Sequence, residues 1–135
     1  MEAMNKSVQA ADFEALTFEF QLGSAESIDS EGWNHCLTDF LEDLSARITA
    51  LPGCIPGHFK LCAMLEKDAD STMKLSSLGL GIPVTSDGHF DHAGGSLFLV
   101  LNLLLAGVSK ETVQGLTIKA LGRICGKYDL VLAET

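Results

Sequence analysis

The stretch from Leu97 to Leu105, LFLVLNLLL, most constrains what this chain can fold into. It is apolar except for Asn102, and glycines stand close on both sides, at Gly94 and Gly107. By period alone, a short apolar run fits either a buried strand or a buried helix. Because such a helix would be apolar all round in a small domain, we predict a strand at the centre of the core.

Shorter segments show the alternation of half-buried strands. Apolar and polar residues alternate over residues 16–22, where Gly23 ends the pattern, and again over residues 58–66. The polar sequence KDADS (residues 67–71) then predicts a tight turn, and alternation resumes at Thr72. We therefore expect the strands on the two sides of this turn to form a hairpin, with residues 84–95 as a loop after it.

Two segments have helical spacing instead. The first begins at Glu31, with Ser30 as a plausible N-cap, and ends at Pro52 and Gly53. The second begins after Ser109 and ends at Gly126, before a last strand over residues 128–133. Gly115 and Gly122 lie on one side of this second helix, which predicts close packing against another backbone.

The resulting order is β-α-β-β-β-α-β, which predicts an α+β two-layer sandwich. Its sheet would be rich in antiparallel pairs, with both helices on one face, and a ferredoxin-like arrangement is one form of it. Residues 1–12 are polar and unpatterned, so we expect a flexible N-terminus. Residues 13–135 contain no repeat or linker and predict a single domain.

Composition limits the classes of function. Of the 135 residues, 47% are hydrophobic and 20% are charged, which fits a folded domain. The formal net charge of −9 argues against nucleic acid and against anionic membrane surfaces as partners. The four cysteines form no CxxC pair, and the first residues do not resemble a signal peptide. We therefore expect reduced thiols and a cytoplasmic protein.

With both helices on one face, the other face of the sheet would be only partly polar. Its expected residues are Glu19, His58, Lys60, Cys62, Met64, Lys74, Phe98, Val100, Asn102 and Leu104. A solvated face would not normally carry the apolar members of this set together on one strand. We predict self-association through this face to give a homodimer, and the alternative cover is the N-terminal segment.

The sequence GHFDHAGG (residues 88–95) has more potential metal ligands close together than any other segment of the chain. His89, Asp91 and His92 stand within four residues, and neutral imidazole and carboxylate are typical zinc ligands. These three residues are therefore candidate ligands of a divalent metal, with zinc the best match. The options for a further ligand are Asp87, His58 and Cys62. The alternative is a solvated glycine-rich loop whose histidines cap turns.

The same string is similar to part of the metallo-β-lactamase motif. In that motif a further histidine stands two positions before the first one, whereas this chain has Asp87 there. The resemblance covers about eight residues, and the later ligand histidines of the family are missing. We take no assignment from it.

A second group of candidates is His58, Lys60 and Cys62. Alternate residues of a strand point to the same face, so these three side chains would form a row. An imidazole, an ammonium and a thiol together could bind an anionic ligand or perform acid–base chemistry. The alternative is a polar sheet edge, or an interface row that meets Glu66 or Glu19 across a dimer.

These observations favour a small ligand- or metal-binding module. The rival hypotheses are a small metal-dependent enzyme that uses His89, Asp91 and His92, and a non-catalytic subunit that is structural or binds a protein partner. We expect any site to lie where the HFDH loop (residues 89–92) approaches the start of the strand at His58. Neither a nucleophile elbow, a P-loop nor a dinucleotide fingerprint occurs.

Overall fold

The apolar run forms a strand at the middle of the sheet in the computed structural model, which describes residues 12–66, 68–79 and 82–133. This strand, β5 (Gly94–Ala106), pairs antiparallel with β1 (Glu14–Ile28) on one side and with β2 (Ile55–Leu65) on the other. Both edges of β5 are therefore occupied, and the choice of strand over helix is confirmed.

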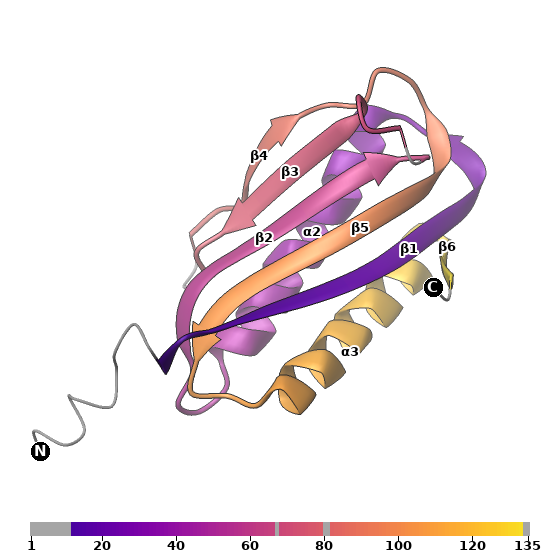
Figure 1. Ribbon diagram of the computed structural model, residues 1–135. Coiled ribbons are helices and arrows are strands. Elements are labelled where there is room, and N and C mark those ends of the chain that lie inside the picture. Colours follow the sequence, from indigo (N-terminus) through magenta and orange to yellow (C-terminus); the bar gives the residue numbers. More distant parts are fainter. Residues whose placement is uncertain (1–11, 67, 80–81, 134–135) are drawn as a thin grey trace, which may run out of the picture.

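Three further strands complete an antiparallel sheet of six, in the order β4-β3-β2-β5-β1-β6. They are β3 (Thr72–Ser77), β4 (Thr85–Gly88) and β6 (Leu130–Ala133). Because β1 and β2 both run antiparallel to β5, they are parallel to each other and form a split β-α-β unit. The hairpin β3–β4 extends the sheet beyond β2 (Figure 1). The ferredoxin-like arrangement stays a prediction.

Both helices cover the same face of the sheet, so the α+β class with two layers is confirmed (Figure 1). They are α2 (Ser30–Thr49) and α3 (Lys110–Tyr128). The helix α3 begins after Ser109, as expected, and Ser109 caps it by accepting a hydrogen bond from the backbone N–H of Thr112. The cap of α2 is Asp29 and not Ser30, because the Asp29 carboxylate accepts from the N–H of Gly32 at 2.8 Å.

The core lies between this face and the helices. On β5, every second side chain points into it and is at most 1% exposed: Leu97, Leu99, Leu101, Leu103 and Leu105. The largest core side chain is Trp33 of α2, which is fully buried and donates its indole N–H to the carbonyl of Gly94. This bond ties the start of α2 to the start of β5.

Several boundaries differ from the sequence prediction. The first strand continues past Gly23 to Ile28, where an irregularity in the register brings Ile28 opposite Gly94. The expected loop over residues 84–95 contains the strand β4, and α3 runs beyond Gly126 to Tyr128, with Asp129 in the left-handed conformation. The predicted flexible N-terminus lies outside the described residues except for Asp12.

A charged cluster joins the outer sides of α2 and α3. Asp39 accepts from Arg123, Lys127 and Tyr128, at 2.5, 2.7 and 2.7 Å. Partial burial alone would raise the pKa of Asp39. The hydrogen bonds from Lys127, Tyr128 and Arg123 and the charge of Arg123 outweigh it and hold that pKa well below its usual range. The carboxylate therefore favours the packed arrangement of the two helices.

The glycines of α3 do not pack against another backbone, so that prediction is wrong. Gly115 and Gly122 are both exposed, and a methyl group added at either position would meet no atom of the described residues within 4 Å. Glycine inside a helix costs about 1 kcal/mol relative to alanine because its backbone loses more conformational freedom. These positions therefore weaken α3 without a compensating contact.

We expect Gly115→Ala and Gly122→Ala each to raise the free energy of unfolding by up to about 1 kcal/mol. Urea denaturation measures the change. Gly107→Ala is the matched comparison, because Gly107 has a φ of 86° and an added methyl group would collide with the carbonyl oxygen of Gly53. It should lower the stability, and a loss of stability in the two α3 variants would contradict the description of an open helix surface.

Candidate functional site

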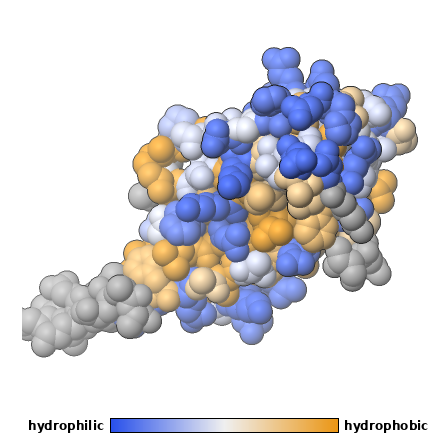
Figure 2. Space-filling view, turned by 45° about the horizontal axis from the view of Figure 1, so that its top comes forward, coloured by the Kyte–Doolittle hydropathy of each residue, from blue (hydrophilic) through white to orange (hydrophobic). Residues whose placement is uncertain are grey.

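The face of the sheet opposite the helices carries the residues expected there. Phe98, Val100 and Leu104 of β5 are half-buried, and neither helix lies over them. The view of the surface shows apolar groups in the middle, surrounded by hydrophilic groups (Figure 2). We call this surface, formed by the outward residues of β1 to β5, the outer face. The other proposed cover, the N-terminal segment, falls in residues 1–11, outside the described part of the chain.

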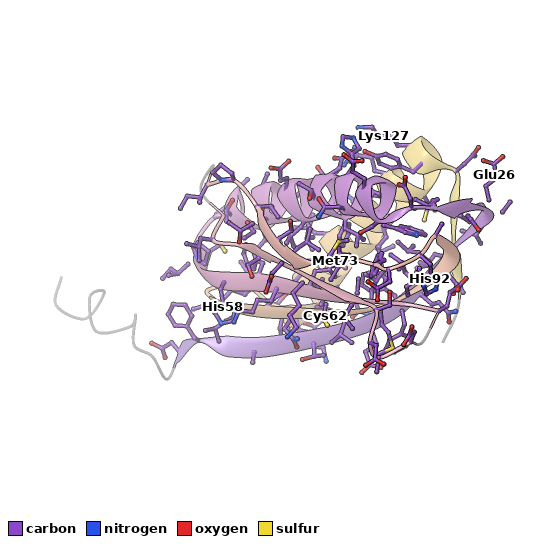
Figure 3. All side chains as sticks on the ribbon, turned by 90° about the horizontal axis from the view of Figure 1, so that it is seen from above. Glu26, His58, Cys62, Met73, His92 and Lys127 are labelled. Atoms are coloured by element: carbon purple, nitrogen blue, oxygen red, sulfur yellow. The ribbon has the colours of Figure 1, made fainter. Side chains whose placement is uncertain are left out.

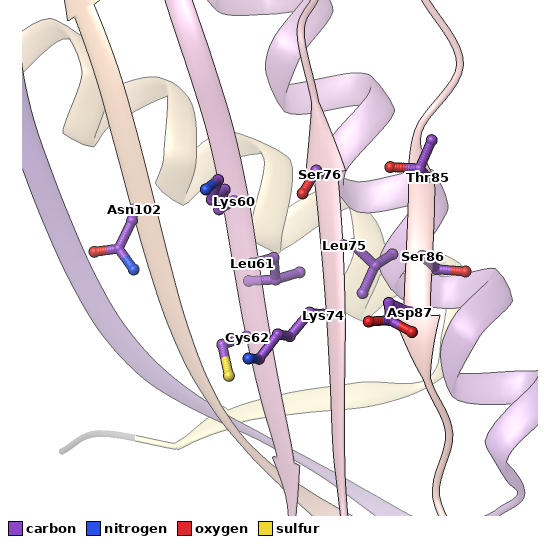
Figure 4. Close-up of a pocket in the computed structure, with 10 residues that line it drawn as sticks. All are labelled: Lys60, Leu61, Cys62, Lys74, Leu75, Ser76, Thr85, Ser86, Asp87 and Asn102. Carbon is purple, nitrogen blue, oxygen red and sulfur yellow. The ribbon is translucent and has the colours of Figure 1, made fainter.

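A hollow of about 410 Å³ lies on one half of the outer face, over β2, β3 and β4 and beside β5 (Figure 4). Its outward-pointing side chains come from all four strands: Lys60, Cys62, Lys74, Ser76, Thr85, Asp87 and Asn102. Strand pairing sets them in rows, since Lys74 lies opposite both Cys62 and Asp87 in the register. We call this feature the outer hollow.

The outer hollow contains more hydrogen-bond donors than acceptors. Neither Lys60 nor Lys74 makes an ion pair within the described part of the chain, and Asp87 is the acidic residue of the lining. Asn102 accepts a hydrogen bond from Thr17 at 2.8 Å through its side-chain oxygen. Its amide nitrogen therefore points toward β2 and the hollow (Figure 4). Two ammonium groups and one amide thus face the same space.

Two of the three candidates on β2 line this hollow. Lys60 and Cys62 are in the lining, next to β3, as the strand alternation suggested. His58 points to the same side of the sheet but lies nearer the start of β2, opposite Leu104, and is not in the lining. Its ring nitrogen Nδ1 is buried, and no described residue forms a hydrogen bond with it. The three side chains lie on the same face, but only Lys60 and Cys62 line the outer hollow, and their role as ligand-binding residues stays a prediction.

The HFDH loop is held by its phenylalanine. Phe90 is 3% exposed and belongs to the core, and its backbone N–H donates to the hydroxyl of Ser30 at 2.9 Å. His89, Asp91 and His92 are exposed. Because Phe90 points into the core, its neighbours, the two histidines and the aspartate, lie at the surface.

The two histidines pair with different carboxylates. His89 Nε2 lies 3.3 Å from Asp91 Oδ1, and His92 Nε2 lies 3.6 Å from Glu66 Oε1. Among the residues that the structure describes, no three His, Cys, Asp or Glu side chains gather closely enough to hold a metal ion. A zinc site on this loop would need a different arrangement of these side chains, and the metal stays a prediction.

The expected meeting of the HFDH loop with His58 does not occur. His92 pairs with Glu66, just beyond the end of β2, whereas His58 stands near the beginning of that strand. His58 and Leu65 are seven residues apart, which at about 3.3 Å per residue is about 23 Å. The labelled His58 and His92 accordingly lie at opposite ends of the sheet (Figure 3). These residues cannot form one site.

The cysteines differ in their surroundings. All four are free, and burial raises the pKa of Cys54 and of Cys125. Burial, followed by the nearby charge of Asp39, raises the pKa of Cys36 to about 12. These three thiols therefore stay protonated at neutral pH, which makes them poor nucleophiles. Cys62 is the cysteine that lines the outer hollow.

Sequence reasoning missed part of the lining. Ser76 could have been found, because it continues the alternation of Lys74 in the predicted hairpin. Thr85 could not, because it lies on β4, whose four residues TSDG are all exposed and carry no apolar signal. Asp87 was named only as an optional metal ligand, and its place on β4 was missed for the same reason. Asn102 was assigned to the correct face, but its hydrogen bond with Thr17 was not predicted.

Comparison with known protein families, with curated proteins and with solved structures finds no match. In the described ranges, neither helix has the length and apolar character needed to cross a membrane.

Proposed function

We propose that this protein is a small ligand-binding module whose site is the outer hollow and whose ligand is a small anion. One observation carries the proposal. In a chain with a net charge of −9, Lys60 and Lys74 are both directed at one hollow, and no acidic group of the described residues pairs with either of them. Their charges are therefore available to an incoming anion.

The lining suits a carboxylate or phosphate group. Two ammonium groups and the amide of Asn102 can donate hydrogen bonds to its oxygens, and the hydroxyls of Ser76 and Thr85 add two more donors. Asp87 favours a ligand that also carries a hydroxyl or an amine, because a carboxylate accepts hydrogen bonds. The volume of about 410 Å³ lies within the usual range for small-molecule sites.

Both lysines are exposed, so solvent weakens their attraction for an anion. We therefore expect simple anions to bind with a Kd of about 1 mM, which corresponds to about 4 kcal/mol. The natural ligand would gain further affinity from contacts with Asp87 and with the hydroxyl groups. The four free cysteines support the cytoplasm as the location of this module.

The proposal can be tested by thermal unfolding with citrate or inorganic phosphate, each compared with sodium chloride of equal ionic strength. At about twenty times its Kd, a ligand that binds only the folded state adds about 1.8 kcal/mol of stability. We expect a rise in Tm for the wild type with at least one of the two anions, and no such rise for Lys60→Gln/Lys74→Gln.

The control is Lys110→Gln/Lys119→Gln, which removes the same charge from exposed positions of α3. Citrate and phosphate also stabilise proteins generally, by exclusion from their surfaces. This general effect should be the same in all three proteins. An equal rise in Tm in the wild type and in both double variants would therefore contradict an anion site at the outer hollow.

A further inference from the structure

The outer face carries charged side chains on both sides of β5, whose own outward residues are apolar except for Asn102. Phe98, Val100 and Leu104 of β5 run along its middle and are half-buried, although no described element covers them. Surfaces of this kind, apolar at the centre with a hydrophilic border, are typical of protein interfaces. The apolar area in the middle of Figure 2 agrees with this description.

The charges nearest to β5 differ in sign between its two sides, and Asp87 on β4, opposite Lys74, adds one acidic group farther out on the β2 side. On the β1 side, the outward-pointing acidic residue is Glu19, which lies beside Val100 in the register. On the β2 side, Val100 lies beside Cys62, and the two lysines flank that cysteine: Lys60 two residues along β2, and Lys74 opposite it on β3. The side chain of Lys74 extends toward Cys62 (Figure 4).

We propose that two copies of this chain pack outer face to outer face across a two-fold axis that runs along β5. Sheets that pack face to face keep their strand directions within about 30° of each other, which such an axis allows. The axis brings β5 against itself and β1 against β2 of the other copy. Glu19 of each copy then meets Cys62 of the partner subunit and stands between that subunit's two lysines.

Charge complementarity is the reason to choose a second copy as the occupant. A two-fold interface needs a surface that complements itself, and here the axis brings Glu19 of each copy to the two lysines of the partner subunit. Elsewhere the net charge of −9 would make two copies repel each other. On the outer face, the attraction between Glu19 and the two lysines opposes that repulsion, while burial of the β5 side chains supplies the hydrophobic contribution.

This inference uses the same lysines as the proposed function, but neither depends on the other. In the dimer, the carboxylate of Glu19 occupies the place of the anionic ligand, so a small anion and the second copy compete. We therefore expect citrate or phosphate, if it binds, to shift the protein toward the monomer.

Sedimentation equilibrium tests this proposal by measuring the mass of the protein in solution. The buffer contains no multivalent anions. We expect the wild type to approach twice the 14.4 kDa of one chain as the concentration rises. Glu19→Lys should weaken the dimer by about tenfold or more, because like charges then face each other. The exchange Glu19→Lys/Lys60→Glu/Lys74→Glu should restore most of the affinity, since it reverses every charge of the pairing.

The matched control is Glu42→Lys, which makes the same charge change on the exposed side of α2, away from the outer face. It should leave the dimer intact. A monomeric wild type at all concentrations would overturn the proposal, as would a dimer that Glu19→Lys does not weaken. Because Glu19 is not in the lining of the outer hollow, the Glu19→Lys protein still reports on anion binding, so the two proposals can fail separately.

Discussion

Replacing Phe90 with alanine is expected to lower the free energy of unfolding by about 3–5 kcal/mol, the usual loss for a buried phenylalanine. Phe90 is 3% exposed, and its ring is the part of the HFDH loop that packs into the core. Its removal leaves a cavity in the core and takes away the side chain that anchors the loop, while the hydrogen bond from the backbone N–H of residue 90 to Ser30 can still form. Urea denaturation of the wild type and of Phe90→Ala measures the difference.

His89→Ala is the matched control, because it alters the neighbouring residue of the same loop. The side chain of His89 is 75% exposed, so its loss should change the stability by less than about 0.5 kcal/mol. If both variants lost the same stability, Phe90 would not be the anchor of the loop. A large loss in His89→Ala alone would instead point to a role of the imidazole, such as metal binding.

Asp39→Asn is expected to cost about 1.5–3 kcal/mol, because hydrogen bonds to a charged group contribute about that much. The carboxylate of Asp39 accepts from three side chains of α3, and its side chain is only 22% exposed. The amide can accept some of these bonds but lacks the charge that Arg123 and Lys127 face. Glu42→Gln, an exposed acid of α2, should have little effect.

The cost of Asp39→Asn should also depend on pH. The pKa of Asp39 is depressed in the folded protein, so its contribution is complete above the ordinary carboxyl pKa of about 3.9 and is lost as the pH falls below it. The stability difference between wild type and variant should therefore be constant near neutral pH and shrink in acid. A difference that does not change between neutral and strongly acidic pH would contradict a stabilising charge at Asp39.

The sequence predicted the faces of the sheet better than its boundaries. Over residues 16–22 of β1, 58–65 of β2 and the start of β3, alternation assigned the side chains to the correct face, because one buried face enforces a period of two. The apolar run became β5 because both of its edges are paired and both neighbours contribute to the same core. The alternation and the apolar run are local patterns, which a sequence contains, whereas the two pairing partners of β5 are set by the tertiary structure.

The errors occur where a local sequence pattern does not contain the tertiary contact that decides the structure. The strand β4 has no buried side chain, and β1 passes Gly23 through an irregularity, so neither has a periodic signal. The prediction for Gly115 and Gly122 assumed a neighbour that only the tertiary structure could reveal. Similarly, the HFDH loop looked like a ligand cluster because the sequence does not show that Phe90 alone points inward.

The sequence predicted only part of the candidate site, because the pairing of strands is not visible in a local pattern. Spacing along β2 identified Lys60 and Cys62 as neighbours on one face, but Lys74, Ser76 and Asp87 reach the outer hollow through the pairing of β2, β3 and β4. Only the register sets these residues side by side. His58 was included by the same alternation, and its distance from the hollow follows from its place near the start of the strand.

A nuclear magnetic resonance titration of the isotope-labelled protein with citrate and with phosphate tests the anion site most directly. The account predicts that backbone and side-chain signals of the outer hollow shift in a saturable manner, led by Lys60, Lys74 and Ser76, and that Lys60→Gln/Lys74→Gln abolishes these shifts. Shifts confined to the start of α3 near Ser109, where any helix N-terminus attracts anions, or no saturable shifts at all, would contradict it.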